Sequence, residues 1–305
     1  MPGLPFPLRG IIPPVCTPLN EDYSVDAASL ARLLRFMLAG GVHGVFMLGS
    51  SSESLFLTDD QRDVVMETAV ETVAGQVPVL AGVFDVTTSL AIEHARAARR
   101  AGVDGLVLTA PFYATFSQEE IVGHFRAVRD AVDLPILAYD IPSTVHVKLT
   151  RDTVARLAHE GLIAGIKDSS GDDANFRGVI LATRDLPDFA TFTGSELVVD
   201  AALLFGASGS VPGLANVDPA GYVRLYDAAR AGDWETARRE QERLYQLFSI
   251  VYSGTPGRVG PTASALGAFK TALMLRGVIA TNVMGRPLTR LNEAEVERVR
   301  RALEL

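Results

Sequence analysis

Three lysines are the only side chains of this sequence that can act as amine nucleophiles. Lys148, Lys167 and Lys270 stand among 28 lysines and arginines, and arginine stays protonated. Lys167 ends the apolar run I-A-G-I-K, so it reaches either into an apolar site or sideways between a strand and a helix. A site of low polarity favours the neutral amine, which can attack a carbonyl carbon and form an imine. An ion pair with Asp168, or a side chain that extends to solvent, is the alternative.

Hydroxyl groups follow other apolar runs. Tyr139 closes P-I-L-A-Y, and a phenol beside an amine can relay protons while an imine forms or a carbon–carbon bond breaks. Ser50 and Ser51 follow a glycine, where hydroxyls and backbone N–H groups can hold a carboxylate. Tyr113 lies in a loop. Each of these residues is also compatible with an ordinary turn or core position. Glu53 can be an acid in the first turn of a helix, where it satisfies the helix end.

The other ionisable residues carry weaker signals. The five histidines lack the spacing of metal ligands, and no nucleophilic-serine, phosphate-loop or zinc motif is present, so we expect neither a metal nor a cofactor. His94, His124 and His159 fall in helical patterns, whereas His146 lies in a loop where it can touch a substrate. Lys270 lies in the helical pattern AFKTALML, where we expect it on the polar edge.

Short β-branched runs must position these residues. Eight such runs alternate with helical patterns, and several are apolar throughout, as in parallel strands that are covered on both faces: 10–16, 44–48, 78–81, 105–109, 135–139, 163–167, 190–193 and 208–211. We expect helices to begin at a set of capping residues: Asp26, Thr58, Ser117 with Glu120, Asp152 and Asp172. Glycines at 40–41, 102 and 161 end helices.

Eight βα units predict a closed (β/α)8 barrel, a TIM barrel of the α/β class, with the active site at the carboxyl ends of its strands. An open doubly wound sheet is the rival, but the first strand lacks the glycine-rich turn that binds dinucleotides. The barrel should span residues 1–231. Residues 232–305 contain helical patterns at 234–253, 261–275 and 292–303 without strands, which predicts a C-terminal helical subdomain.

Composition excludes several classes of protein. A formal charge of −8 and a pI near 5.2 argue against binding to nucleic acid, although a small anionic substrate needs only local donors. No apolar stretch is long enough to span a membrane, and the N-terminal sequence does not read as a secretory signal. The single cysteine, Cys16, fits a reducing compartment. We expect a cytoplasmic protein.

Three ordered motifs resemble those of the dihydrodipicolinate synthase / N-acetylneuraminate lyase superfamily: G-S-S-S-E at 49–53, Y-D-I-P-S at 139–143 and G-I-K-D at 165–168. The opening G-I-I-P-P-V-C-T-P-L and the segment 206–216 fit as well, so the resemblance covers nearly the whole chain. It implies a class I aldolase barrel that needs no metal and that acts on pyruvate or another 2-oxo acid.

The resemblance also implies roles for individual residues. Lys167 would be the imine lysine and Tyr139 the proton relay. Ser50 and Ser51 would replace the threonine/serine pair that binds the carboxylate and passes protons. Tyr113 matches a hydroxyl that, in the family's common tetramer, reaches in from a neighbouring subunit, so we expect a homo-oligomer, either a dimer or a tetramer. Residues that border the substrate should include Gly194 and Val211.

Departures from the family pattern surround the second substrate. Thr144 stands where the synthase usually has an arginine that binds the carboxylate of its aldehyde, and a neutral hydroxyl cannot replace a bidentate cation. Val145 and His146 replace a Thr-Gly pair, Ser52 replaces a glycine, and residues 82–85 replace a smaller polar segment. The candidates for the pocket that selects the aldehyde are Asp140, Thr144, His146, Phe84 and Ser195.

The sequence therefore predicts a Schiff-base lyase or aldolase whose aldehyde substrate is not identified. Three alternatives stay open: a dehydratase of 2-oxo-3-deoxy sugar acids that uses the same imine, a 4-hydroxy-tetrahydrodipicolinate synthase, and a barrel that binds 2-oxo acids without catalysis. The departures around Thr144 make the synthase the less favoured reading.

Overall fold

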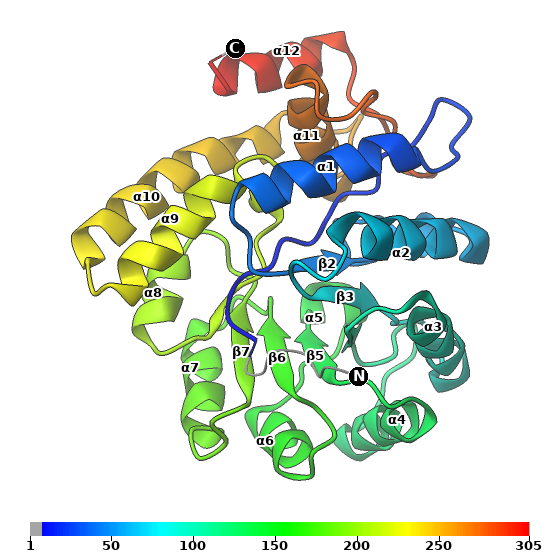
Figure 1. The fold of residues 1–305 in the computed structure, drawn as a ribbon, viewed down its shortest axis with the longest axis vertical. Helices are drawn as coiled ribbons and strands as arrows, with labels where there is room; N and C mark the ends of the chain where they lie inside the picture. The colour runs from blue at the N-terminus through cyan, green and yellow to red at the C-terminus, as the bar shows by residue number, and fades with distance from the viewer. Residues whose placement is uncertain (1–7, 305) are drawn as a thin grey trace.

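The computed structural model describes residues 8–304 and confirms the predicted (β/α)8 barrel (Figure 1). Eight parallel strands lie side by side in the order β1-β8-β7-β6-β5-β4-β3-β2. Their bounds are close to the predicted runs: β1 Gly10–Ile11, β2 Val45–Met47, β3 Val79–Gly82, β4 Gly105–Leu108, β5 Ile136–Asp140, β6 Gly165–Asp168, β7 Ala190–Thr193 and β8 Gly209–Ser210.

The seam between β1 and β2 closes the barrel. An isolated parallel bridge joins Pro14 to Phe46 there. The Val15 amide donates to the Phe46 carbonyl and the Phe46 amide to the Pro13 carbonyl, each at 2.9 Å. The first predicted strand, 10–16, is therefore mostly an extended segment, because only Gly10–Ile11 forms a ladder, and it does so with β8.

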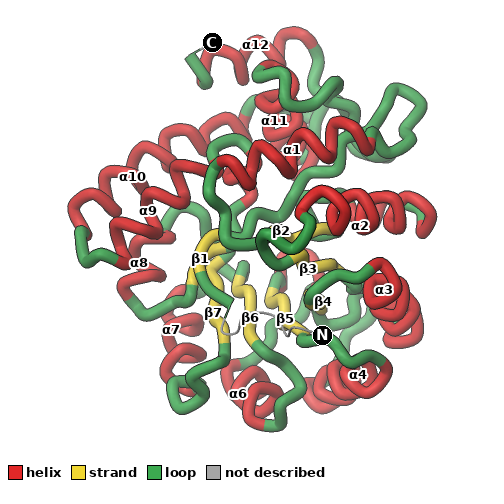
Figure 2. The backbone as a smooth tube through the Cα atoms, in the orientation of Figure 1, coloured by secondary structure: helices red, strands yellow, loops and turns green. Residues whose placement is uncertain are grey.

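Helices surround the strands (Figure 2). They are α1 Ala27–Ala39, α2 Asp59–Val73, α3 Thr88–Ala101, α4 Gln118–Ala131, α5 Pro142–Val145, α6 Arg151–His159, α7 Asp173–Ala182, α8 Val199–Leu204, α9 Pro219–Arg230, α10 Trp234–Leu247, α11 Pro261–Leu275 and α12 Glu293–Ala302. Short 3-10 segments are η1 Ser54–Phe56, η2 Gly213–Asn216 and η3 Phe248–Tyr252. In parallel barrels such a helical layer covers the outer face of the strands.

Most predicted helix starts are confirmed by side-chain caps. Thr58 and Ser117 form capping boxes with Gln61 and Glu120, in which each partner satisfies a free N–H of the other's backbone. Asp26 and Asp172 cap α1 and α7 through their carboxylates. The prediction for α6 was wrong by two residues: Thr150 is its cap, and Asp152 lies in the first turn, where a negative charge favours the helix N-terminus.

Alternation along the strands divides the core into two clusters. The smaller one fills the barrel with side chains such as Phe46, Leu137, Tyr139 and Phe192. The larger one lies between the strands and the surrounding helices. Successive side chains of a strand point to opposite faces, so the residue after an inward-pointing one faces the helical layer.

The C-terminal helices lie at one side of the ring of strands (Figure 1), and the segment after α11 accepts a hydrogen bond from Arg32 of α1, at the Val278 carbonyl at 3.1 Å. The bounds of α11 match the predicted helix, and α12 follows its cap Asn292. Lys270 is not on a polar edge, as we expected, but wholly buried on α11, where it pairs with Glu53 and donates to the Val283 carbonyl at 2.7 Å. The boundary at Gly232, between α9 and α10, stays a prediction.

Two sequence-based expectations concern membranes and secretion. Among the described residues, no helix combines the length and the apolar character that crossing a membrane requires. Part of the N-terminal segment that does not read as a secretory signal, residues 1–7, lies outside the residues that the structure describes.

Candidate active site

Lys167 and Tyr139 are neighbours inside the barrel. They are register partners on β6 and β5, and both point into the inner cluster. The Lys167 Nζ atom lies 4.1 Å from the centre of the Tyr139 ring and 5.3 Å from that of Phe46. Lys167 is only 5% exposed, and among residues 8–304 no carboxylate pairs with it. The amine is thus surrounded by aromatic faces rather than by a counter-charge.

Asp168 does not pair with Lys167, which removes that alternative. Asp140 and Asp168 follow Tyr139 and Lys167 on their strands and therefore point to the opposite face, where Lys148 bridges the two carboxylates. Asp140 also accepts from the Leu149 amide at 3.1 Å. Burial raises the pKa of Asp140, and the bond from Lys148 opposes that rise. We therefore leave Asp140 out of the proposed substrate contacts.

The serine-rich turn after β2 borders the inner cluster, since a side-chain carbon on Gly49 would lie 2.8 Å from the Phe46 ring. The Ser52 hydroxyl donates to the Val15 carbonyl at 2.5 Å and accepts from the Gly49 amide at 3.1 Å, so it pins the turn to the β1 segment. Glu53 ends the turn in the left-handed conformation, with φ of 58°, and is buried with Lys270. Ser50 is exposed and Ser51 is partly buried. Both hydroxyls remain available to a ligand.

Glu196 is a site residue that the sequence patterns did not reveal. Its carboxylate accepts from the Leu214 amide at 2.7 Å and from the Tyr222 hydroxyl at 3.5 Å. Desolvation raises the pKa of Glu196 to about 7, against the opposing pull of those donors and of Lys167. A side-chain carbon added to Gly213 would lie 3.0 Å from Glu196 Oε1 and 3.4 Å from Ser51 Oγ. The segment after β7 thus brings an acid close to the serine turn.

Gly194 and Val211 border the same region. A side-chain carbon on Gly194 would lie 2.0 Å from the Ser169 Oγ atom and 3.2 Å from the Lys167 Cε atom, so the missing side chain leaves room for both residues. Val211 belongs to the inner cluster and is buried, with its amide bonded to the Thr193 carbonyl at 2.9 Å. Ser195 follows Gly194, and its amide donates to the Thr193 hydroxyl.

A cavity of about 280 Å³ lies against the serine turn. Ser50, Ser51 and Thr144 line it, together with Phe84. His146 is exposed and caps α5 with φ of 59°, and it does not line this cavity. Tyr113 is 95% exposed, with φ of 80°. The structure brings the predicted serines, Thr144 and Phe84 together, whereas the side chains of Tyr113 and His146 extend into solvent.

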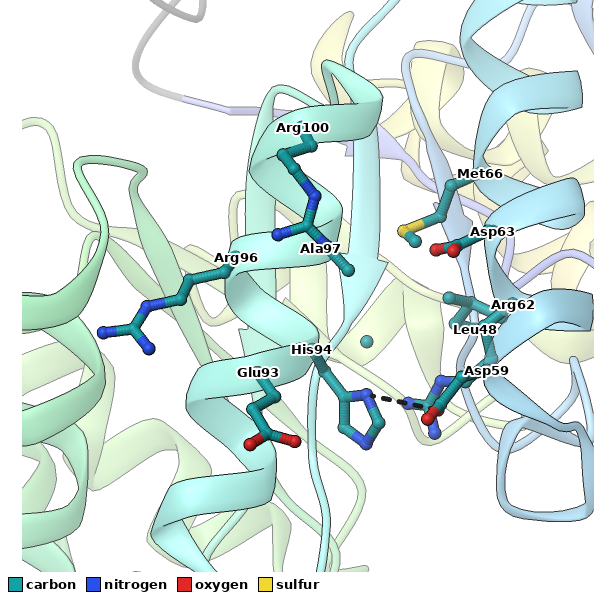
Figure 3. Close-up of a pocket in the computed structure, with 11 residues that line it drawn as sticks. Leu48, Asp59, Arg62, Asp63, Met66, Glu93, His94, Arg96, Ala97 and Arg100 are labelled. Carbon is teal, nitrogen blue, oxygen red and sulfur yellow. Dashed lines mark ion pairs between the residues drawn. The ribbon is translucent and has the colours of Figure 1, made fainter.

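A second cavity, of about 320 Å³, lies between α2 and α3 (Figure 3). Its lining is mixed in charge: Arg62, Asp63, Glu93 and Arg100 contribute, and His94 bonds Asp85 at 2.9 Å. It shares no lining residue with the cavity beside the serine turn. Among residues 8–304, no group of three or more His, Cys, Asp or Glu side chains is arranged to hold a metal ion.

The comparisons with known proteins identify the family of this chain. The model of the dihydrodipicolinate synthetase family matches residues 7–305. An uncharacterized DapA-like lyase from Halobacterium salinarum is 37% identical over 275 residues, which cover 90% of this chain and 86% of that one. The 4-hydroxy-tetrahydrodipicolinate synthase of Methanospirillum hungatei is 31% identical over 298 residues, 97% of this chain and 98% of that one.

Solved structures give the same answer. Dihydrodipicolinate synthase from Bacteroides thetaiotaomicron superposes with a TM-score of 0.93 at 32% identity, over 99% of each chain. A prophage protein of the dihydrodipicolinic acid synthase family from E. coli K12, solved in complex with pyruvate, has a TM-score of 0.90 at 30% identity, over 97% of each chain. The chain therefore belongs to the dihydrodipicolinate synthetase family, and the predicted class of enzyme, a lyase of the Schiff-base aldolase type, is confirmed with it.

Proposed function

We propose that Lys167 forms the Schiff base with pyruvate or a closely related 2-oxo acid. One observation carries the assignment: of the three lysines, Lys148 and Lys270 are held by carboxylates, whereas Lys167 lies against the Tyr139 ring with no carboxylate partner among the described residues. Its nitrogen attacks the keto carbon and water leaves, which gives a protonated imine. Loss of a proton from the adjacent carbon gives an enamine, which adds to an aldehyde. The reverse sequence cleaves the same bond.

The neighbouring hydroxyls complete the proposed site. The Tyr139 hydroxyl, with those of Ser51 and Tyr113, moves protons to and from the nitrogen and the leaving oxygen. Ser50, Ser51 and backbone N–H groups hold the carboxylate of the 2-oxo acid, and Gly194 and Val211 shape the space around it. The pyruvate complex of the E. coli family member supports this choice of first substrate.

We further propose that the enzyme is a homo-oligomer, a dimer or a tetramer, in which Tyr113 reaches a neighbouring site. The support is its nearly complete exposure on the loop after β4. Tyrosine is enriched at protein–protein interfaces relative to the rest of the surface. We also propose a cytoplasmic location, on the ground that the only cysteine, Cys16, is buried and makes no disulfide.

Reductive trapping tests the lysine assignment. Borohydride added with pyruvate should leave a stable mass increase on the peptide that carries Lys167. Lys167→Ala should lose both the label and turnover, while Lys148→Ala, if it folds, should keep the label. Robust turnover by Lys167→Ala would overturn the assignment. Products from sugar acids separate the remaining chemistries: released pyruvate indicates aldol cleavage, loss of water indicates a dehydratase, and binding without a label indicates a non-catalytic barrel.

A further inference from the structure

The cavity beside the serine turn combines apolar walls with hydroxyl groups. Eight of the fifteen residues that line it are aromatic or aliphatic, and six carry hydroxyls: Leu55, Phe56, Phe84, Phe112, Ile141, Val145, Ala265 and Leu266, with Ser50, Ser51, Ser54, Thr109, Thr144 and Thr262. Sites for small molecules commonly combine such walls with a few orienting polar groups. The composition of these walls therefore bears on what the cavity accepts.

This cavity is connected to the surroundings of the proposed imine through Phe84, although neither Lys167 nor Tyr139 lines it. Phe84 lines it and also belongs to the inner cluster, where its ring lies 6.3 Å from the Tyr139 ring in an edge-to-face arrangement. Ser51 lines the cavity as well. A molecule held here would therefore lie beyond the 2-oxo acid, on the side of Tyr139 and Ser51. That is the position that the second substrate of an aldol reaction must take.

The cavity offers no charge to a substrate. Among its lining residues Glu53 is the only ionisable one, and its carboxylate is already bound by Lys270 and by the Gly285 amide at 2.6 Å. The cation nearest in sequence to the Thr144 wall, Lys148, is bound to Asp140 and Asp168. An anionic aldehyde would have to lose its hydration here without gaining a cationic partner, which is costly. The hydroxyls of the lining can orient a carbonyl oxygen, while its aromatic and aliphatic side chains favour an apolar group.

We infer that the second substrate is an uncharged, apolar aldehyde, aliphatic or aromatic; this inference rests on the proposed function. In the condensation, the enamine carbon bonds to the aldehyde carbon and the aldehyde oxygen takes a proton. Water then hydrolyses the imine and releases Lys167 together with a 4-hydroxy-2-oxo acid. Phe84, Phe112 and Ile141 hold the apolar group, and the Thr109 and Thr144 hydroxyls lie within the same walls.

A matched aldehyde panel tests the inference in the wild-type enzyme. Trapping of pyruvate on Lys167 is measured first, so that a failure to form the imine is distinguished from a failure of the aldehyde preference. The values of kcat/KM with pyruvate are then compared for butanal, 4-oxobutanoate and glyceraldehyde, and for benzaldehyde and 4-carboxybenzaldehyde. Each neutral apolar aldehyde should exceed its carboxylated partner and glyceraldehyde by about tenfold or more. A preference for the anionic or polyhydroxylated member, or trapping without turnover of any neutral aldehyde, would overturn the inference.

Two substitutions connect the preference to the cavity. Thr144→Arg places a cation at its wall and should shift the ratio of 4-oxobutanoate to butanal by about tenfold toward the anion, whereas Thr144→Gln, similar in length but neutral, should not. Phe84→Ala should lower kcat/KM for benzaldehyde about 10- to 100-fold and leave the trapping of pyruvate in place. Unchanged selectivity in both Thr144→Arg and Phe84→Ala would place the second substrate elsewhere.

Discussion

The buried pair between Lys270 and Glu53 should dominate the stability of the region that holds the serine turn. Both side chains are wholly buried. Replacing Lys270 by methionine keeps the volume but leaves a carboxylate without its counter-charge, which costs about 3–5 kcal/mol. Glu53→Gln leaves the ammonium unpaired and should cost a similar amount. Proteins of ordinary stability unfold with about 5–15 kcal/mol, so either variant should be severely weakened.

The double variant Glu53→Gln, Lys270→Met should be more stable than either single one. It contains no buried charge, and the glutamine oxygen can still accept from the Gly285 amide. The remaining loss is the donor to the Val283 carbonyl, about 1–3 kcal/mol. The two single losses should therefore exceed the double loss by about 2 kcal/mol or more.

Urea unfolding at neutral pH, followed by circular dichroism, measures the four members of this cycle. The matched control is the exposed pair of Arg301 and Glu297 on α12. Its cycle should show a coupling below about 1 kcal/mol, because solvent screens exposed charges. If the two losses at Glu53 and Lys270 were additive, so that their coupling energy was as small as that of the surface pair, the reasoning would be refuted. Packing would then be the reason for the burial of Lys270.

Three further predictions concern catalysis, assembly and pH. Tyr139→Phe keeps the ring but removes the proton relay, so kcat should fall about 10²- to 10⁴-fold while pyruvate trapping remains detectable; an unchanged kcat would exclude the relay. Mixing Tyr113→Phe with Lys167→Ala should give more activity than either alone if subunits share sites, whereas subunit exchange without rescue would contradict this. Burial lowers the pKa of His124 to about 4. Below pH 6.5 the unfolded chain binds a proton that the folded chain does not, so stability should fall by about 1.4 kcal/mol per pH unit down to about pH 4. His124→Gln should flatten this slope in urea unfolding, and equal slopes would count against it.

Local patterns predicted the fold because its signals are local. Capping residues such as Thr58 and Ser117 act within one turn, and the apolar strands are recognised by their own composition. The ends of the strands placed Lys167 and Tyr139 correctly in space, since parallel strands bring their carboxyl ends together. The pattern at residues 10–16 did not reveal that only two of these residues form a ladder. The segment after Ile11 bonds instead to Phe46, which lies in a different part of the chain.

The missed and misplaced residues depend on partners far away in sequence. Lys270 looked like a surface lysine, yet its partner Glu53 lies in the turn after β2, and no local pattern reveals such a pair. The Glu196 carboxylate is held by a hydrogen bond from the Leu214 amide, in the segment after β8. Asp140 is different, because it directly follows the inward-pointing Tyr139 on the same strand. Strand alternation alone therefore assigns Asp140 to the outer face, away from the substrate.

Two of the three lysines are held in ion pairs, which has a consequence for chemical labelling of this protein. Reagents that modify amines need an accessible, uncharged nitrogen, and Lys270 is buried within the fold while Lys148 is bound by two carboxylates. Apart from the amino terminus, Lys167 is the remaining primary amine. Lys167 is itself only 5% exposed, so a probe small enough to enter the barrel should be needed to reach it, and digestion should separate its label from that of the amino terminus. Random crosslinking or immobilisation through surface lysines, by the same reasoning, should be inefficient for this arginine-rich protein.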